Sequence, residues 1–558
     1  MTAVAGRLAV LDRPMGRTLY YGLALLLGVL YIARIFPWDF LTGHSGFFFD
    51  NRTDPTQHIT GMWAFVQDRW RFPLLYTRLL NAPEGLSVAY TDSIPLAAIL
   101  FKVIYPWLPP GSHYFGVWTL GCYLLQGLAG AYAAASFRGR TPAALLGGTL
   151  FALMMPALMI RIPHAALNAQ FLMILMLAHY ARLSRGQLVP GQFWRYGTAL
   201  LVLSATIHPY LIAMLYPLYG AVSLAIGVRR SASWRTVAVA LVAPLPLLAL
   251  VLYVLGYLSF SQGMPPAEVG YIESSMNLLS PFLGTHLAPS VFLPSGGLVL
   301  DATGLQIDGH NYLGVGLLAM LLSILVLAPR WLLSQCRQHW VLLLVFVGLT
   351  LYALSNRVYL GGTALFEYPL LPGVEQLARI FRGSGRFFWP VGYGLLILAL
   401  GFYLTRASSV WRLVLLALIV VQYADTRHHR GYLVEAASRQ PHFDYDRATW
   451  DARVASASEV HLLPNYGCGG KPFDALFLQY FSALHAVPLN TGFIARVVGD
   501  CATKAAVLDR PLQPGQLFVF GRSENAYSRE RIEQAMGGHY GQWCREEDIG
   551  TVCRIEAP

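Results

Sequence analysis

The sequence predicts an α-helical membrane protein that crosses the bilayer about eleven times and ends in a small soluble α/β domain. Of its 558 residues, 55% are hydrophobic and only 12% are charged, whereas a soluble domain carries about a quarter charged residues. Apolar stretches near the ~20 residues needed to cross a bilayer recur from about residue 18 to residue 423, and ordinary globular sequence follows them. We therefore expect a membrane domain at 1–425 and a soluble domain at 426–558.

The arginines predict how the chain is oriented. The net charge of +11 is a weak indication of nucleic-acid binding, because the arginines stand in short turns between apolar stretches, where they act as orientation signals. If these turns are cytoplasmic, the N-terminus lies in the cytoplasm and the C-terminal domain lies outside. The predicted spans then fall at about 18–36, 113–136, 142–160, 166–182, 195–208, 210–228, 236–258, 311–328, 340–356, 387–405 and 411–424.

Composition and the N-terminus bear on the compartment. Only three of the 40 basic residues are lysines, a bias that we interpret as that of a GC-rich bacterial genome. The N-terminus lacks a cleavable signal pattern, because Arg7, Arg13 and Arg17 lead straight into a full-length span. We expect the first helix to remain as an anchor in the bacterial cytoplasmic (inner) membrane, with the C-terminal domain in the periplasm.

One apolar stretch, residues 94–110, does not fit the count of spans. It is short, contains Lys102 and ends in prolines, which favours an interfacial or re-entrant helix on the outer side. With this assignment the outer face collects residues 37–112, several short loops and the whole tail. Nearly every polar group that could carry chemistry lies in these segments.

The first outer loop carries the strongest candidates, in the stretch FFFDNRTDPTQHITGMW. Asp54 followed by Pro55 has the pattern of an N-cap with proline at the first helical position, so we expect a helix to begin there. A capping role for Asp54 explains neither Asp50 nor His58, which flank it at spacings of four residues. Asp54 and His58 could meet across the first turn. We therefore take Asp54 and Asp50 as candidate catalytic residues and His58 as a substrate-binding residue.

Four further outer residues are candidates. Asp92 precedes the non-crossing helix, where capping is the stronger explanation and substrate orientation the alternative. Arg161 and His164 lie in MIRIPHAALNAQ. An arginine on the outer side is an exception to the rule that positive charge stays inside, so we expect Arg161 to have an anionic partner. That partner is either Asp50 or Asp54, in a salt bridge, or a phosphate. His310, beside Asp308 in DGHNYLGVG, stands at the entrance to another span. His208 is more simply explained as a satisfied core histidine.

Three arginines precede a late span in EQLARIFRGSGRFFWP, namely Arg379, Arg382 and Arg386. Such a cluster suits a phosphate or pyrophosphate at the depth of the lipid headgroups, where bidentate guanidinium contacts are strong. The alternative is headgroup anchoring, or pairing with Glu367 and Glu375.

The tail reads as a small α/β domain. Strands are expected at EVHLLP, QLFVFG and TVCRIE, and helices at PFDALFLQYFSALH and SRERIEQAMGG. Its four cysteines fit two disulfides and an oxidising compartment; Cys468 with Cys501 and Cys544 with Cys553 are favoured as nearest neighbours in sequence, and zinc binding is the rival. No phosphate loop or nucleophile elbow is visible, so we expect a lid or acceptor-binding module.

The acidic first outer loop, the many spans, the arginine-bearing outer loops and the soluble tail resemble the GT-C superfamily of polyprenyl-phosphate-sugar-dependent glycosyltransferases. DPTQHITGM, TDSIPL and FRGSGRFFWP look like a bacterial branch of that superfamily. The resemblance covers about residues 18–425 and leaves the tail unmatched. It implies an essential acidic residue in the first outer loop, matched by Asp54 or Asp50, and basic residues gripping the lipid phosphate, matched by Arg382 and Arg386. The adjacent acidic pair usual in the superfamily is absent, which leaves the choice of base and of any metal open.

The resemblance implies transfer of a sugar from a polyprenyl-phosphate-linked donor to an envelope glycan, lipid or protein acceptor. Because the donor already has a good leaving group, such an enzyme needs positive charge on the departing phosphate and a base for the acceptor hydroxyl. We expect a single displacement with inversion, in which Asp54 is the base, and Asp50 assists or binds a divalent cation, Mg²⁺ or Mn²⁺. Arg161, Arg382 and Arg386 would hold the phosphate, and His58 and His164 would position oxygens.

Two rival functions belong to other classes. A transporter or flippase of lipid-linked saccharides would show charged or broken helices near the membrane midplane, and often inverted repeats. In this chain the charges gather at one edge. A non-catalytic scaffold for envelope enzymes would not require an arginine cluster facing an acidic loop.

Overall fold

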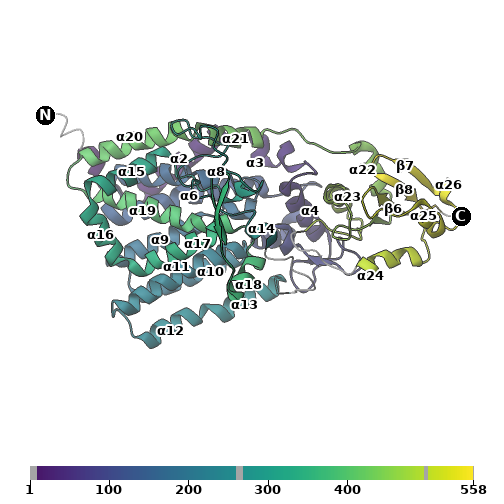
Figure 1. The fold of residues 1–558 in the computed structure, drawn as a ribbon, viewed down its shortest axis with the longest axis horizontal. Coiled ribbons are helices and arrows are strands. Elements are labelled where there is room, and N and C mark those ends of the chain that lie inside the picture. The colour runs from purple at the N-terminus through teal and green to yellow at the C-terminus, as the bar shows by residue number, and fades with distance from the viewer. Residues whose placement is uncertain (1–8, 259–267, 495–500, 557–558) are drawn as a thin grey trace.

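The computed structural model describes residues 9–258, 268–494 and 501–556. The apolar helices of the first 425 residues run side by side along the longest axis of the molecule (Figure 1). The N-terminal end of the chain lies at one end of this bundle and the C-terminal domain at the other. The bundle helices are α2 (Arg17–Ile35), α6 (Phe115–Arg138), α7 (Pro142–Leu153), α9 (Phe171–Ser184), α10 (Pro190–Ala205), α11 (Pro209–Val228), α12 (Trp234–Val242), α13 (Pro244–Leu255), α15 (Val315–Leu327), α17 (Trp340–Leu354), α19 (Trp389–Thr405) and α20 (Val410–Asp425).

Each of the eleven segments predicted to cross a membrane coincides with helix. By length and composition, four helical segments of the described residues could cross one: Arg17–Ile35, Pro209–Val228, Trp234–Leu255 and Ser384–Thr405. A fifth is obtained if α15 and α16 (Pro329–Gln338), which meet at an angle of 101°, count as one broken span. The structure therefore supports a membrane-associated helical protein, and the number of eleven crossings stays a prediction.

Small residues allow the central helices to approach closely. A Cβ added at Gly130 of α6 would lie 2.1 Å from the carbonyl oxygen of Gly148 of α7, and one at Gly148 would lie 2.3 Å from that of Gly130. Neither position can accept a side chain without moving a backbone. Glycine pairs of this kind are the usual means of helix packing where hydrophobic burial supplies little driving force between helices.

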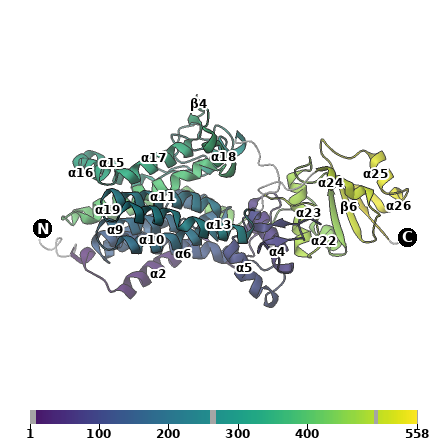
Figure 2. The same cartoon turned by 90° about the horizontal axis from the view of Figure 1, so that it is seen from below.

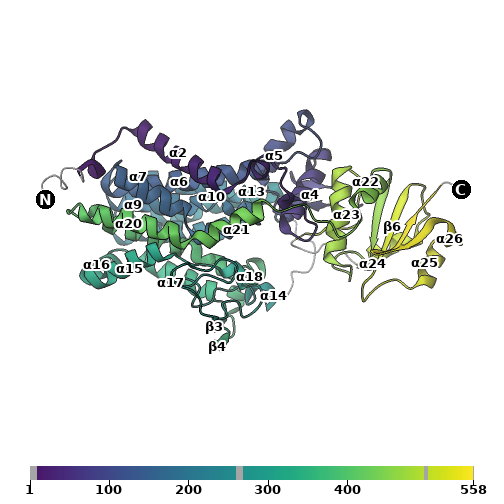
Figure 3. The same ribbon diagram turned by 90° about the horizontal axis from the view of Figure 1, so that it is seen from above.

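Short elements lie toward the same end of the bundle as the C-terminal domain. They are α3 (Trp38–Thr42), η2 (Gly46–Phe48), α4 (Asp54–Gln67), β1 (Tyr76–Thr77), β2 (Leu86–Ser87), η3 (Val88–Thr91), α5 (Pro95–Ile104), η4 (Tyr105–Trp107), α8 (Pro156–Met159), η5 (Ala165–Asn168), α14 (Glu268–Tyr271), η6 (Gln306–Gly309), β3 (Arg357–Leu360), β4 (Thr363–Glu367), α18 (Pro372–Ile380), η7 (Ser384–Phe388) and α21 (Arg427–Ala437). Figure 2 shows α4 and α5 between the bundle and the C-terminal domain, and Figure 3 shows the hairpin β3–β4 projecting from the side of the bundle.

The predicted non-crossing segment folds as α5 and η4. Lys102 turns inward: its Nζ donates to the carbonyl oxygen of Phe65 over 2.6 Å and lies 4.0 Å from the ring centroid of the same residue. Leu100 and Trp107 point outward and are 62% and 78% exposed. The exposed face of this segment is apolar and its one lysine turns inward, while its interfacial placement stays a prediction.

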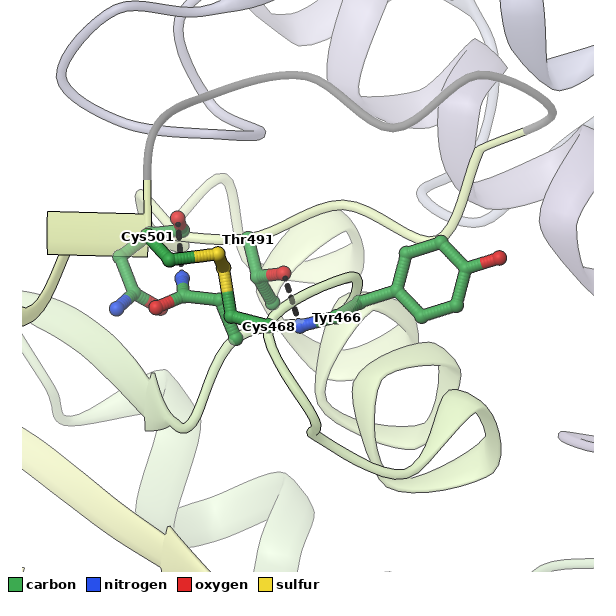
Figure 4. The surroundings of a disulfide bond; sticks show 6 residues. Tyr466, Cys468, Thr491 and Cys501 are labelled. Atoms are coloured by element: carbon green, nitrogen blue, oxygen red, sulfur yellow. Dashed lines mark hydrogen bonds between the residues drawn. A yellow bond between two sulfur atoms is a disulfide. The ribbon is translucent and has the colours of Figure 1, made fainter. Parts of the chain in front are cut away.

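The C-terminal domain contains a four-stranded sheet of order β5-β6-β8-β7, in which β5 and β6 are parallel and the other pairs antiparallel. All three predicted strands and both predicted helices are present, and β7 is an additional strand. The elements are α22 (Arg447–Ala455), β5 (Glu459–Leu463), α23 (Pro472–Leu484), α24 (Cys501–Ala505), η8 (Ala506–Asp509), β6 (Gln516–Gly521), α25 (Arg529–Ala535), α26 (Tyr540–Trp543), β7 (Cys544–Glu547) and β8 (Gly550–Arg554). Both favoured disulfides, Cys468–Cys501 and Cys544–Cys553, are confirmed; Figure 4 shows the first of them.

Polar contacts fasten the C-terminal domain to the first outer loop. Arg52 donates from Nε to Oδ1 of Asp444 over 2.7 Å, and Lys504 forms an ion pair of 2.5 Å with Glu84. The backbone N–H of Asn81 donates to the carbonyl oxygen of Thr491. The tail thus lies directly over the loop that carries the candidate catalytic residues.

Candidate functional site

Asp54 and His164 form the contact at the centre of the candidate site. Asp54 is the first residue of α4, and its Oδ2 lies 3.3 Å from Nε2 of His164, in the loop between α8 and η5. The predicted N-cap role of Asp54 is wrong, because the helix includes Asp54 and Thr53 takes the cap position. The side chain of Asp54 is 45% exposed. Its carboxylate is therefore accessible to a substrate, at the helix end that stabilises negative charge.

Asp308 joins two arginines from distant parts of the chain. Its Oδ2 accepts a hydrogen bond of 2.7 Å from Nη2 of Arg386, and its Oδ1 accepts one from Nη1 of Arg161. We call Arg161, Asp308 and Arg386 the charged triad. The predicted anionic partner of Arg161 is confirmed, but it is Asp308 rather than Asp50 or Asp54. The triad carries one net positive charge and is largely buried.

His164 connects the charged triad to Asp54, because its Nε2 also lies 3.4 Å from Nη2 of Arg386. One ring nitrogen cannot donate to a carboxylate and accept from a guanidinium at the same time. Burial and the charge of Arg386 lower the pKa of His164, and Asp54 only partly opposes them. The imidazole is therefore neutral at pH 7, and the position of its single ring proton decides which neighbour it binds.

Asp92 anchors a second group beside the first. Its Oδ1 lies 2.9 Å from Nε2 of His208, at the start of α11, and its Oδ2 lies 3.8 Å from Nε2 of His58. The prediction that Asp92 caps the next helix is wrong, because Ile94 is the N-cap residue of α5. Asp92 and Ile94 both have positive φ, 53° and 50°. Ile is β-branched and adopts this conformation only under constraint, and such outliers concentrate at functional sites.

The surroundings keep Asp308 and Asp92 ionised. Burial would raise the pKa of Asp308, but the guanidinium groups of Arg386 and Arg161 outweigh it, and the pKa lies well below its usual range. Burial likewise opposes ionisation of Asp92, whose pKa is nevertheless low because of His208 and other nearby imidazoles. Both carboxylates are thus fixed charges that hold other groups in place, whereas Asp54 is the exposed one.

His58 faces Asp92 and not Asp54, contrary to the contact considered from its spacing. Its side chain is buried, and Nε2 has no hydrogen-bond partner among the described residues. Burial lowers the pKa of His58, and the nearby Asp92 and Asp54 only partly oppose it. A neutral imidazole with an unused ring nitrogen can still bind a substrate hydroxyl or a water.

One nitrogen of Arg386 remains for a ligand. Among the described residues, its buried Nε has no hydrogen-bond partner. Gly383 packs directly against this nitrogen, since a Cβ at that position would lie 2.8 Å from Nε. The guanidinium also lies 5.1 Å from the ring centroid of Tyr210, whose hydroxyl accepts a hydrogen bond from the N–H of Gly383. Leaving a buried donor unpaired costs about 1–3 kcal/mol, and more for a charged group, which favours an anionic ligand here.

The other two predicted arginines lie apart from the triad. Arg379 donates to Oε1 of Glu375 over 2.7 Å, which is the alternative of pairing within its own segment. The side chain of Arg382 packs over Gly270. Its charge also partly offsets the effect of burial, which raises the pKa of Tyr466 in the C-terminal domain. Of the three predicted arginines, only Arg386 belongs to the charged triad.

Asp50 does not join Asp54. Its Oδ1 accepts a hydrogen bond of 3.0 Å from the backbone N–H of Arg52, and its own backbone N–H donates to Oγ1 of Thr56. Within residues 9–258, 268–494 and 501–556, no three His, Cys, Asp or Glu side chains are arranged to hold a metal ion. Asp50 and Asp54 therefore do not belong to a preformed three-ligand site within the described residues, and the divalent cation considered from the sequence stays a prediction.

His310 is paired with another histidine in the interior. Its Nε2 lies 3.0 Å from Nε2 of His429, and the two side chains are 2% and 0% exposed. Burial, with the nearby His429, lowers the pKa of His310 well below its usual range. Two neutral rings that share one proton account for this pair. Because the ring of His310 is buried, it is not available for direct contact with a substrate.

Sequence reasoning did not assign Asp308, His208 or Tyr210 to the site. Asp308 could have been found from the scarcity of acidic residues. The chain has only 29 acidic residues against 40 basic ones, so a carboxylate in an outer loop is a natural partner for a buried outer arginine. For His208 and Tyr210 the pattern offered no such signal, because only packing brings the start of α11 beside Asp92 and Arg386.

Two family models match successive parts of the chain. A family model described as Domain of unknown function (DUF6311) matches residues 25–427, and a model of the DUF6311 C-terminal domain matches residues 449–555. No curated protein matches the chain. Because the first model covers more than half of the 558 residues, the chain belongs to the DUF6311 family.

Proposed function

We propose that this protein is a membrane glycosyltransferase that moves a sugar from a polyprenyl-phosphate-linked donor to an envelope glycan, lipid or protein acceptor. One observation carries the proposal: an exposed carboxylate, Asp54, and a guanidinium with an unused buried nitrogen, Arg386, are separated by a single imidazole. A base and an anion-binding group at this separation suit a reaction that removes a proton at one end and releases a phosphate at the other.

The reaction is one balanced displacement. Asp54 takes the proton of the acceptor hydroxyl, the acceptor oxygen forms a bond to the anomeric carbon, and the bond from that carbon to the phosphate oxygen breaks. The electron pair leaves with the lipid phosphate. Attack opposite the leaving group inverts the anomeric centre. The developing charge on the phosphate is stabilised by Arg386, and such preorganised donors are worth about 10²–10³-fold in rate.

The remaining groups support these two functions. Arg161 and Asp308 hold Arg386 in place, since Asp308 ties both guanidinium groups. His164 accepts from Arg386 or donates to Asp54, so it orients the base and can bind a sugar or phosphate oxygen. Asp92 orients His58 and His208 beside them. The buried triad is a poor source of stability but a good way of fixing charge positions.

For the membrane topology and the compartment, we propose eleven crossings of the bacterial cytoplasmic membrane, a GT-C-like membrane domain and a periplasmic C-terminal domain. The charged groups gather at the end of the bundle nearest the tail, which supports surface chemistry over transport through the bilayer. Both disulfides in the tail fit an oxidising compartment.

The test is transfer of labelled sugar by the purified full-length protein in detergent or nanodiscs. A panel of polyprenyl-phosphate hexoses and pentoses is offered as donors, with membrane extract as acceptor. Asp54→Asn should abolish transfer while leaving expression and thermal unfolding unchanged. Asp39→Asn, which alters an exposed aspartate of the same outer region, is the matched control and should transfer normally.

Asp50→Asn decides between the two candidate bases. Because the carboxylate of Asp50 is bound to the N–H of Arg52, we expect at most a small loss of transfer. Full activity of Asp54→Asn would remove Asp54 as the base. If wild type transfers no sugar from any donor of the panel, the enzymatic proposal itself is rejected.

A further inference from the structure

An aromatic pair from the C-terminal domain is attached to α4, the helix that begins at Asp54. The rings of Tyr466 and Phe493 have centroids 5.0 Å apart at an interplanar angle of 51°. Tyr466 follows β5 in the loop that carries Cys468, and Phe493 lies in the segment after α23. Figure 4 shows Tyr466 pointing away from the disulfide, with its hydroxyl at the far end of the ring.

Three hydrogen bonds hold Phe493 against α4. Gln57 donates from Nε2 to the carbonyl oxygen of Phe493 over 3.0 Å, and the N–H of Phe493 donates to Oε1 of Gln479 over 2.7 Å. The same Gln479, which is fully buried, donates from Nε2 to Oγ1 of Thr60 over 2.7 Å. Two residues of α4 are thereby tied to one point of the tail.

This attachment fixes where the pair lies relative to the reacting groups. Gln57 is three residues after Asp54 on α4, so both side chains lie on the same face of the helix, about one turn apart. On the other side, Arg382 is near enough to Tyr466 for its charge to act on the phenol. The pair is therefore attached to the helix that carries the proposed base, Asp54.

The loop around Tyr466 is built to be rigid. The N–H of Tyr466 donates to Oγ1 of Thr491 over 3.1 Å, and Nδ2 of Asn465 donates to the carbonyl oxygen of Asn490 over 2.9 Å (Figure 4). The disulfide from Cys468 holds the following residues. An aromatic side chain on such a scaffold binds with little loss of conformational entropy.

Two features of Tyr466 point to a ligand rather than to core packing. Its side chain is only partly buried. Among the described residues its hydroxyl has no hydrogen-bond partner, although a phenol in a protein interface normally finds one. A partly exposed ring face, with a hydroxyl that has no partner within residues 9–258, 268–494 and 501–556, matches a pyranose, which has an apolar C–H face and a polar rim.

We propose that Tyr466 and Phe493 form the subsite for the saccharide of the acceptor, with the sugar stacked on the Tyr466 ring and its nucleophilic hydroxyl directed at Asp54. This rests on the proposed glycosyl transfer and assigns the C-terminal domain the selection of the acceptor. The acceptor class is then a glycan or glycolipid that ends in a pyranose.

The test measures saccharide binding directly, without catalysis. Saturation-transfer NMR on the full-length protein in micelles uses methyl glucopyranoside, methyl mannopyranoside, methyl galactopyranoside and N-acetylglucosamine as probes. Wild type should bind at least one of them. Tyr466→Ala should bind it about tenfold more weakly, as expected for loss of an aromatic contact, and Tyr466→Phe should retain most of the binding because it keeps the ring.

Tyr540→Ala is the matched control, since Tyr540 is a partly buried tyrosine of the same domain whose hydroxyl binds Glu546. Thermal unfolding confirms that each variant is folded. The proposal is overturned if wild type binds none of the probes, if Tyr466→Ala binds as well as wild type, or if Tyr540→Ala weakens binding equally. Binding that depends on Tyr466 without any sugar transfer would sustain the subsite and reject the glycosyltransferase. If sugar is transferred and the acceptor KM is unchanged in Tyr466→Ala, the glycosyltransferase is sustained and the subsite is rejected.

Discussion

Replacing Arg386 by glutamine tests whether the charged triad both supports the fold and serves the reaction. The change removes the 2.7 Å hydrogen bond to Asp308 and the contact with His164, at a side chain that is only 10% exposed. Breaking a buried ion pair costs about 3–5 kcal/mol when a charge is left alone. Asp308 keeps Arg161 as a partner, so the loss should be closer to that of a single hydrogen bond to a charged group, about 2–3 kcal/mol.

Arg379→Gln is the control, because it removes the same charge seven residues earlier from an exposed pair with Glu375, whose side chains are 36% and 39% exposed. Exposed pairs contribute about 0.2–1 kcal/mol. Unfolding in mixed micelles with increasing sodium dodecyl sulfate should therefore show a clear loss of stability for Arg386→Gln and almost none for Arg379→Gln.

Sugar transfer gives the second readout of the same pair. Arg386→Gln should reduce the rate about 10²–10³-fold, as removal of one preorganised charge stabiliser does, and Arg379→Gln should leave it near wild type. Arg386→Lys keeps the charge without the planar fork and should recover stability better than rate. Equal unfolding and equal transfer in the Arg386→Gln and Arg379→Gln variants would falsify the role assigned to the triad.

Two other predictions follow from the geometry of the triad. Gly383→Ala is compatible with the local φ of −70° but places a Cβ 2.8 Å from Nε of Arg386. The donor KM should therefore rise about tenfold, with little change in unfolding. Gly373→Ala is the control, because Gly373 has open space around it, and it should change neither the donor KM nor unfolding. The pKa of Asp308 is lower in the folded state than the usual value of about 3.9. Its stabilising effect is therefore complete above about pH 4 and is lost as the pH falls further. Thermal unfolding between pH 3 and 6 should lose part of its pH dependence in Asp308→Asn, and an unchanged pH profile would contradict this assignment.

Much of the architecture followed from local pattern. Apolar stretches long enough for helices and the alternating strands of the tail both act over short distances in the chain, and they predicted helices and strands that the structure contains. The two disulfides followed from nearness in sequence. What pattern could not decide is how many of the helices cross a membrane, because several of them are short or only partly apolar.

The candidate site, too, was predicted in part from the sequence and decided in part by the tertiary structure. The sequence by itself determined that Asp54, Arg161, His164 and Arg386 are polar groups in segments where polarity has to be explained, since placing a charge beside apolar spans is costly without a partner. Only the tertiary structure decided which partners they have. Asp308 binds both arginines, Asp92 binds histidines instead of capping a helix, and Asp50 turns away to a backbone N–H. The pairings of Asp308 with Arg161 and Arg386 and of Asp92 with His208 join residues 78 to 147 positions apart, and side-chain charge acts through distance in space, which the order of residues along the chain does not contain.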